Sequence, residues 1–307
     1  MKKLKQTYLR STRIVGAALL LLMIIGSIWD LPISKFLYPG RESSFGQFFA
    51  AFGELPAFLA MTSAGVLLFV NRARLRKSWN VLFVAASAAL VLGGLGLSIH
   101  EATDNVPALP LWVAALVTVF TAALCAVLLL ILTDGCQMKT LLRFICVLAF
   151  VSIGTMLLIN VIKIPWGRPR MRLLVETGNE SYFMPWWKLG ISLKSKLVAD
   201  GVSSDEFRSF PSGHTGCAAC AMLMILLPTL GKRLRGKERL CLCIGLAWTL
   251  IVAVSRLMMG AHFLTDVTAA TLLTLGVSIL GIWLFYFNGA FFRRVWNLVA
   301  EKGQDAE

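Results

Sequence analysis

The sequence has few charged residues. Only 15% of its 307 residues are Asp, Glu, Lys or Arg, whereas 57% are hydrophobic and the mean hydropathy is +0.75. Soluble globular domains carry about 25% charged residues, so this composition excludes an ordinary soluble protein. We expect an integral membrane protein.

Cysteine is also scarce and is placed in apolar surroundings. Six of the seven cysteines lie within or at the end of apolar runs, and Cys136 lies in a turn. This distribution is not that of a disulfide framework. The C-x-x-C spacing of Cys217 and Cys220 falls inside an apolar segment without a second pair, which indicates small buried side chains.

The chain has no internal repeat and no low-complexity tract, and we interpret it as one membrane domain.

Long apolar runs, in contrast, are abundant. A helix of roughly 20 apolar residues crosses the hydrocarbon core of a bilayer. The sequence predicts an all-α, polytopic membrane helix bundle of about eight transmembrane helices. The predicted spans are 14–31, 55–71, 79–99, 109–133, 143–162, 213–230, 240–257 and 264–287. The first lacks a small-x-small cleavage site and is expected to be a retained anchor, followed by an interfacial segment near 33–51.

The net charge of +14 does not indicate a nucleic-acid partner, because the basic residues cluster in every second connection. This alternation is typical of cytoplasmic loops, so both termini are expected in the cytoplasm. The expected location is a bacterial plasma (inner) membrane. The opposite, external or periplasmic, connections are about 32–54, 100–108, 163–212 and 258–263.

Two of the three histidines lie where this outer surface meets an apolar helix. His214 ends the run Phe210-Pro211-Ser212-Gly213-His214, and His262 lies in Ser255-Arg256-x5-His262-x3-Asp266. A third segment, Lys163-x6-Arg170, reaches the same level. His100 has no such neighbours and is interpreted as a loop residue.

These residue types are suited to phosphate chemistry. Lys163, Arg170 and Arg256 can offset the charge of a phosphate dianion. Ser212 and Gly213 begin a predicted helix, whose free N–H groups favour an anion. No metal or other cofactor is required.

The two histidines can divide the work of phosphoryl transfer. His262 and Asp266 are spaced i, i+4, so on a helix the carboxylate can accept the imidazole Nδ1–H and leave Nε2 as a nucleophile. His214 can protonate the leaving alkoxide and then deprotonate water.

At these residues the chain resembles the type 2 phosphatidic acid phosphatase superfamily, whose motifs are K-x6-R-P, P-S-G-H and S-R-x5-H-x3-D. The resemblance covers about 143–287, with helices 1–142 before it and a cytoplasmic tail at 288–307. It implies a metal-independent lipid phosphate phosphatase with a phosphohistidine intermediate. The implied phosphate ligands are Lys163, Arg170, Ser212, Gly213 and Arg256, and the implied catalytic residues are His262 (nucleophile), His214 (acid and base) and Asp266 (orienter).

Two features depart from the family pattern. Met171 stands where the first motif has Pro, whereas an Arg168-Pro169 pair would place Val161 at the Lys position. The Lys163 spacing favours Arg170 as the ligand and leaves Arg168 as an extra anion contact. The family commonly has three spans before its first motif, and this chain has five, so two helices are additional.

Other functions remain open at this stage. A transporter or lipid-scaffolding protein could bind a phosphate headgroup without cleaving it, but it would not need His214, His262 and Asp266 together. A phosphotransferase would share the intermediate and differ in its acceptor, and a haloperoxidase would hold vanadate. The aromatic residues within 171–210 can select a lipid or simply anchor the loop; they are Tyr182, Phe183, Trp186 and Trp187. Substrate identity and oligomeric state are not determined by the sequence.

The alternation of basic connections predicts the topology. A reporter fused after residue 235 is expected on the cytoplasmic side, and one inserted within 190–205 on the external side. Alkaline phosphatase and fluorescent-protein fusions measure this. Reversed signals would move the predicted site to the cytoplasmic face.

Overall fold

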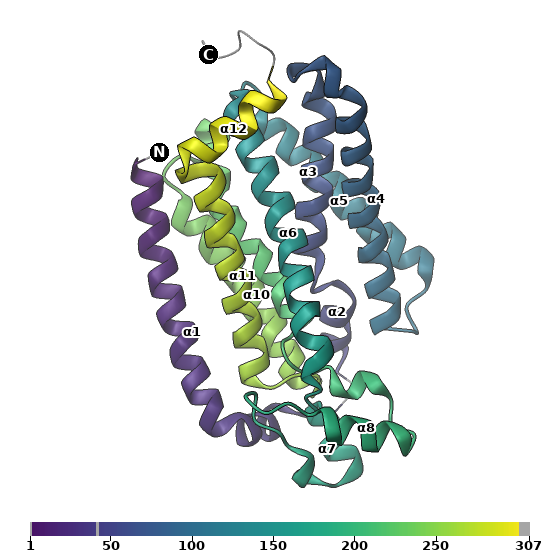
Figure 1. The fold of residues 1–307 in the computed structure, drawn as a ribbon. Coiled ribbons are helices and arrows are strands. Elements are labelled where there is room, and N and C mark those ends of the chain that lie inside the picture. The colour runs from purple at the N-terminus through teal and green to yellow at the C-terminus, as the bar shows by residue number, and fades with distance from the viewer. Residues whose placement is uncertain (1, 41–42, 301–307) are drawn as a thin grey trace.

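The computed structural model describes residues 2–40 and 43–300, without the side chains of residues 2 and 3, and in these residues it contains helices and no strands. The predicted all-α polytopic bundle is confirmed (Figure 1). Part of the predicted tail, 301–307, lies outside the described residues. The helices are α1 (Lys2–Leu37), α2 (Ser44–Phe52), α3 (Leu55–Asn71), α4 (Asn80–Asn105), α5 (Leu111–Thr133), α6 (Met138–Trp166), α7 (Met171–Thr177), α8 (Ile191–Ala199), α9 (Gly213–Ala219), α10 (Glu238–Met258), α11 (Leu264–Ile282) and α12 (Gly289–Val299).

Seven helical stretches of the described chain are long and apolar enough to cross a membrane. The eighth predicted span, 213–230, is the shorter apolar helix Gly213–Thr229, in which α9 continues as the 3₁₀ segment Cys220–Thr229. Because a 3₁₀ helix rises about 2.0 Å per residue, this segment still reaches roughly 30 Å. Eight crossings therefore stay a prediction. The interpretation of His100 as a loop residue is wrong, because α4 continues to Asn105.

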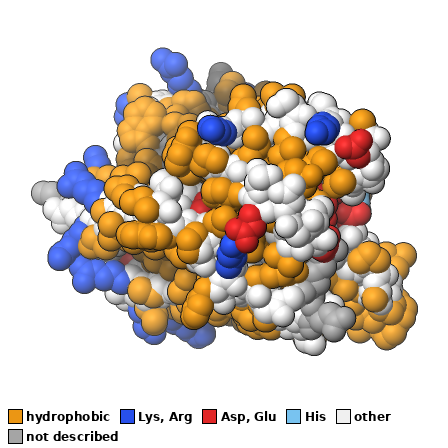
Figure 2. Space-filling model, turned by 90° about the horizontal axis from the view of Figure 1, so that it is seen from below, with side chains coloured by type: hydrophobic (Ala, Val, Ile, Leu, Met, Phe, Trp, Pro, Cys, Tyr) orange, Lys and Arg blue, Asp and Glu red, His pale blue; other side chains and the backbone are white. Residues whose placement is uncertain are grey.

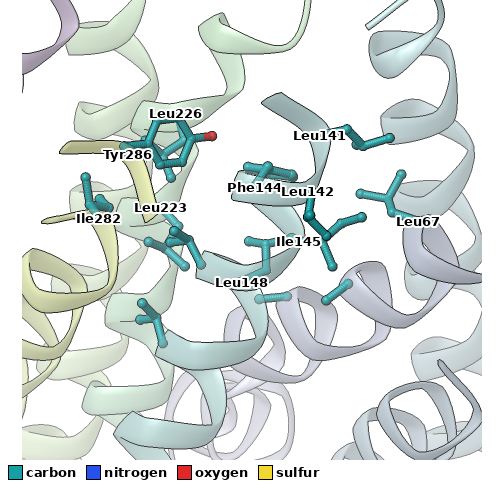
Figure 3. Packing of buried hydrophobic residues seen from close by; sticks show 14 of the residues in the cluster. Leu67, Leu141, Leu142, Phe144, Ile145, Leu148, Leu223, Leu226, Ile282 and Tyr286 are labelled. Atoms are coloured by element: carbon teal, nitrogen blue, oxygen red, sulfur yellow. The ribbon is translucent and has the colours of Figure 1, made fainter. Parts of the chain in front are cut away.

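The apolar core surrounds α6. This helix packs against α3, α9 and α11, and its buried face includes Leu141, Phe144 and Leu148. Figure 3 shows Phe144 and Leu148 between Leu67 of α3 and Leu223 of the 3₁₀ segment. Residues spaced three or four apart share one face of a helix, so this spacing buries a continuous stripe.

The polar connection after α6 folds over one end of the bundle. Figure 1 places α7 and α8 at this end, while the start of α1 and the whole of α12 lie at the other. Figure 2 views the molecule from this end and shows basic and acidic side chains scattered among many hydrophobic ones. Such a mixed surface suits the boundary between lipid and water.

The helix α6 ends in a tight reversal. Gly167 has φ of +67°, a left-handed conformation that favours glycine, and a Cβ there would lie 3.1 Å from the Gly190 carbonyl carbon. The reversal directs the next residue, Arg168, back into the protein, where its side chain is fully buried.

Arg168 connects three distant parts of the chain. Its guanidinium lies 2.9 Å from Asp30, on the kinked C-terminal part of α1, and 2.5 Å from Asp266 in the first turn of α11. It also donates to the Thr265 hydroxyl and to the Met184 carbonyl. The prediction that Arg168 is an extra anion contact is therefore wrong, because buried protein groups already occupy its Nε and both of its Nη atoms.

We predict that Arg168→Met strongly destabilises the protein. The substitution leaves two buried carboxylates without their cation, a change that typically costs about 3–5 kcal/mol. Thermal unfolding in detergent should show a large fall in Tm. Arg172→Met is the matched control. Arg172 pairs with Glu206 at a partly exposed site, so this substitution should lower Tm much less. Equal falls in Tm would contradict the assigned role of Arg168.

Candidate active site

The predicted site residues come from separate elements that meet at the α7/α8 end of the bundle. Lys163 lies in the last turn of α6, Arg170 precedes α7, and Arg256 lies in the last turn of α10. Ser212 to His214 form the start of α9, and His262 lies in the turn between α10 and α11. The three cations and His214 all act electrostatically on His262.

The three cations keep capacity for an anion. Arg170 pairs with Asp205 at 2.7 Å, and an Nη atom of Arg256 donates to the Gly46 carbonyl at 3.1 Å. The Nε atoms of both arginines are buried without a hydrogen-bond partner among the described residues. Buried donors of this kind favour a ligand that can accept from them.

The start of α9 lies beside Lys163. A Cβ added to Gly213 would lie 3.3 Å from Lys163 Nζ, so the glycine leaves room for the lysine and for an anion. The N–H groups of Gly213 and His214 are in the first helical turn and have no acceptor within the helix. The Ser212 hydroxyl has another task, because it caps α9 by accepting from Thr215 N at 3.3 Å.

The imidazole of His262 is oriented by a backbone carbonyl. Its Nδ1 lies 2.6 Å from Ser209 O and 3.9 Å from Asp266 Oδ2. The predicted direct hydrogen bond from Nδ1 to Asp266 is therefore wrong. The reason is that His262 precedes the N-cap of α11, so the i, i+4 spacing does not place the two residues on one helical face.

The hydrogen bond from His262 Nδ1 to Ser209 O has the same chemical consequence as the predicted bond to Asp266. A carbonyl oxygen only accepts, so Nδ1 carries the proton and Nε2 is left with its lone pair. Burial and the cations Lys163, Arg170 and Arg256 hold the pKa of His262 well below its usual range. The imidazole is therefore neutral at pH 7, as a nucleophile must be.

Asp266 reaches His262 through Ser209. The Ser209 hydroxyl donates to Asp266 Oδ2 at 2.5 Å, and the same carboxylate accepts from Phe263 N at 2.8 Å and from Arg168. Asp266 thus fixes the residue whose carbonyl holds the imidazole. Ser209 is a position of the candidate site that the sequence pattern does not reveal, because its contribution includes a backbone atom that every residue has.

His214 has two partners from the N-terminal part of the chain. Its Nε2 lies 2.9 Å from Ala50 O in α2, and its Nδ1 lies 3.0 Å from the Glu54 carboxylate before α3. Glu54 was also missed. Its signal in the sequence was a single acidic residue between two apolar runs, and ionisable residues in such surroundings usually mark function.

Residues 140–290 match the model of the PAP2 superfamily. No curated protein and no solved structure matches the chain. The matched segment contains the three cations, the start of α9, His262 and Asp266, whereas Ala50 and Glu54 lie outside it. This segment is similar to the PAP2 superfamily, as the three motifs predict, and the match supports a phosphatase-type (phosphoesterase) function.

Proposed function

We propose that the protein is a metal-independent lipid phosphate phosphatase that works through a phosphohistidine intermediate. The observation that carries the proposal is the neutral His262, with Nδ1 bonded to Ser209 O and Nε2 free to attack, next to three cations. An anion binding there would have its charge offset while a nucleophile faced its phosphorus.

The reaction has two balanced steps. His262 Nε2 forms a bond to phosphorus as the bond to the lipid oxygen breaks, and His214 gives a proton to that oxygen. Water then attacks the phosphohistidine, His214 takes back a proton, and phosphate leaves with His262 restored. The cations Lys163, Arg170 and Arg256 stabilise the charge on the equatorial oxygens in both steps.

An apolar groove supports a lipid as the substrate. The groove has a volume of about 610 Å³ and runs over α11 between α1 and α6. At one end it is lined by Trp166, Trp186 and Phe210, the last of which directly precedes Pro211 and Ser212. An apolar groove on lipid-facing helices, whose lining includes Phe210 two residues before Ser212, suits an acyl or isoprenoid chain.

The proposed site faces the non-cytoplasmic side, because the α7/α8 end carries the connection that the charge pattern predicts to be external. A phosphotransferase remains the second candidate, since it needs the same intermediate with a lipid hydroxyl in place of water.

The direct test is phosphate release by purified protein from defined lipid phosphates. A panel of phosphatidate, phosphatidylglycerol phosphate, undecaprenyl pyrophosphate and lipid A phosphates would identify the substrate class.

Activity should persist in excess EDTA and be inhibited by vanadate, because side-chain cations supply the positive charge. Loss of activity that Mg²⁺ restores would contradict the mechanism. Phosphate appearing on an added lipid alcohol would favour the transferase.

The two histidines should separate kinetically with p-nitrophenyl phosphate. Its leaving group scarcely needs protonation, so His214→Ala should release a burst of about one nitrophenolate per site and then turn over slowly. His262→Ala should show neither phase, and Asp266→Asn a slower burst. Rapid-mixing absorbance measures these phases. A burst kept by His262→Ala and lost by His214→Ala would show that the roles are reversed.

A further inference from the structure

The contact between Glu54 and His214 lies inside the candidate site, although Glu54 lies outside the matched family segment. Both residues are buried, each with 8% of its surface exposed. A Cβ on Gly213 would lie 3.7 Å from Glu54 Oε1 and 3.3 Å from Lys163 Nζ. The carboxylate therefore sits beside the first residue of α9, where the phosphate is expected.

The hydrogen bonds of His214 determine where its protons are. Ala50 O can only accept, so Nε2 must carry a hydrogen. Nδ1 then faces a carboxylate at 3.0 Å. One further proton must lie between these two groups, either on Nδ1 with Glu54 ionised or on Glu54 with Nδ1 accepting. Without it, a lone pair would face a buried carboxylate.

Of the two contacts, only the one to Glu54 can be exchanged for a substrate. The Ala50 carbonyl is fixed in the backbone of α2, whereas the Glu54 side chain ends the short connection between α2 and α3. Nδ1 is thus the nitrogen that can turn from the carboxylate to the leaving oxygen.

We propose that Glu54 is a positioning residue that keeps on His214 Nδ1 the proton required by the leaving group. This inference rests on the proposed function and adds a residue to it. When the ester bond breaks, the shared proton passes from Nδ1, turned toward the lipid oxygen, to that oxygen. His214 is then neutral, its Nδ1 lone pair faces the new hydroxyl, and Glu54 stays ionised. The attacking water returns a proton to Nδ1, which restores the pair.

A different role for Glu54 would be that of a counterion. Arg256 and Lys163 act electrostatically on the carboxylate, so removing its charge would change how strongly every phosphate ester binds. A counterion role changes all substrates in parallel. A proton-holding role changes only those whose leaving group needs a proton.

The experiment compares two probes in wild type, Glu54→Gln, Glu54→Asp and the surface control Glu180→Gln. Dodecyl phosphate has a basic alkoxide leaving group, whereas p-nitrophenyl phosphate does not. Glu54→Gln should lower single-turnover phosphoenzyme formation from dodecyl phosphate about 100-fold, the lower range for loss of general acid catalysis. The nitrophenolate burst should change less than about threefold, and Glu54→Asp should recover part of the alkyl rate. Glu180→Gln should match wild type.

A double substitution tests whether Glu54 acts through His214. Glu54→Gln combined with His214→Ala should be no slower on dodecyl phosphate than His214→Ala alone, since the two residues would share one function. The proposal would be overturned if Glu54→Gln lowered the rate of phosphoenzyme formation equally with both probes. It would also be overturned if the rate losses of the two single variants were fully additive in the double variant. Size-exclusion profiles and Tm values exclude misfolding, and Glu54→Asp retains the test if Glu54→Gln does not fold. If wild type releases no phosphate from either probe, the proposed function itself has failed, which differs from a selective or parallel effect at Glu54.

Discussion

The site depends on one buried cation, Arg168. Its guanidinium lies between Asp30 of α1 and Asp266 of α11, and all three side chains have less than 5% of their surface exposed. Buried carboxylates need a cation as a partner, and a buried guanidinium needs an anion. The contact therefore holds α1, α11 and the segment after α6 in place relative to one another. The kink of α1 near Trp29 and the reversal at Gly167 both serve this contact, because they bring Asp30 and Arg168 inward.

The same contact indirectly fixes His262, the proposed nucleophile. With Oδ1 bound to Arg168, Asp266 uses Oδ2 to hold the Ser209 hydroxyl and Phe263 N. The Ser209 carbonyl is then placed to accept from His262 Nδ1. A carbonyl fixes the tautomer as a carboxylate would, and the Asp266 carboxylate, 3.9 Å from Nδ1, is itself paired with Arg168. Burial and the nearby cations together lower the pKa of His262.

Much of this arrangement can be predicted from the sequence, and there are physical reasons why the remainder cannot. Apolar runs predict the spans because hydrocarbon thickness fixes their length, and the boundaries of α3 agree with the predicted 55–71. Lys163 and Arg256 are recognisable because they lie at the predicted external ends of apolar helices, whereas most basic residues cluster in the alternate connections. The role predicted for Arg168, an extra anion contact, is wrong, because a sequence does not show which of two neighbouring arginines points into the protein. The partners Ala50, Gly46 and Ser209 contribute carbonyl oxygens, which no side-chain pattern can reveal.

The N-terminal helices consequently contribute to the candidate active site as well as to the helix bundle. The family segment begins at residue 140, yet Arg256 and His214 depend on acceptors in α2 and on Glu54 before α3. The short helix α2 can supply both acceptors because its residues 46 and 50 are one turn apart and face α10 and α9 together. A core made of residues 140–290 alone would leave a buried guanidinium and a buried imidazole without these partners, so the two halves of the chain form one functional unit.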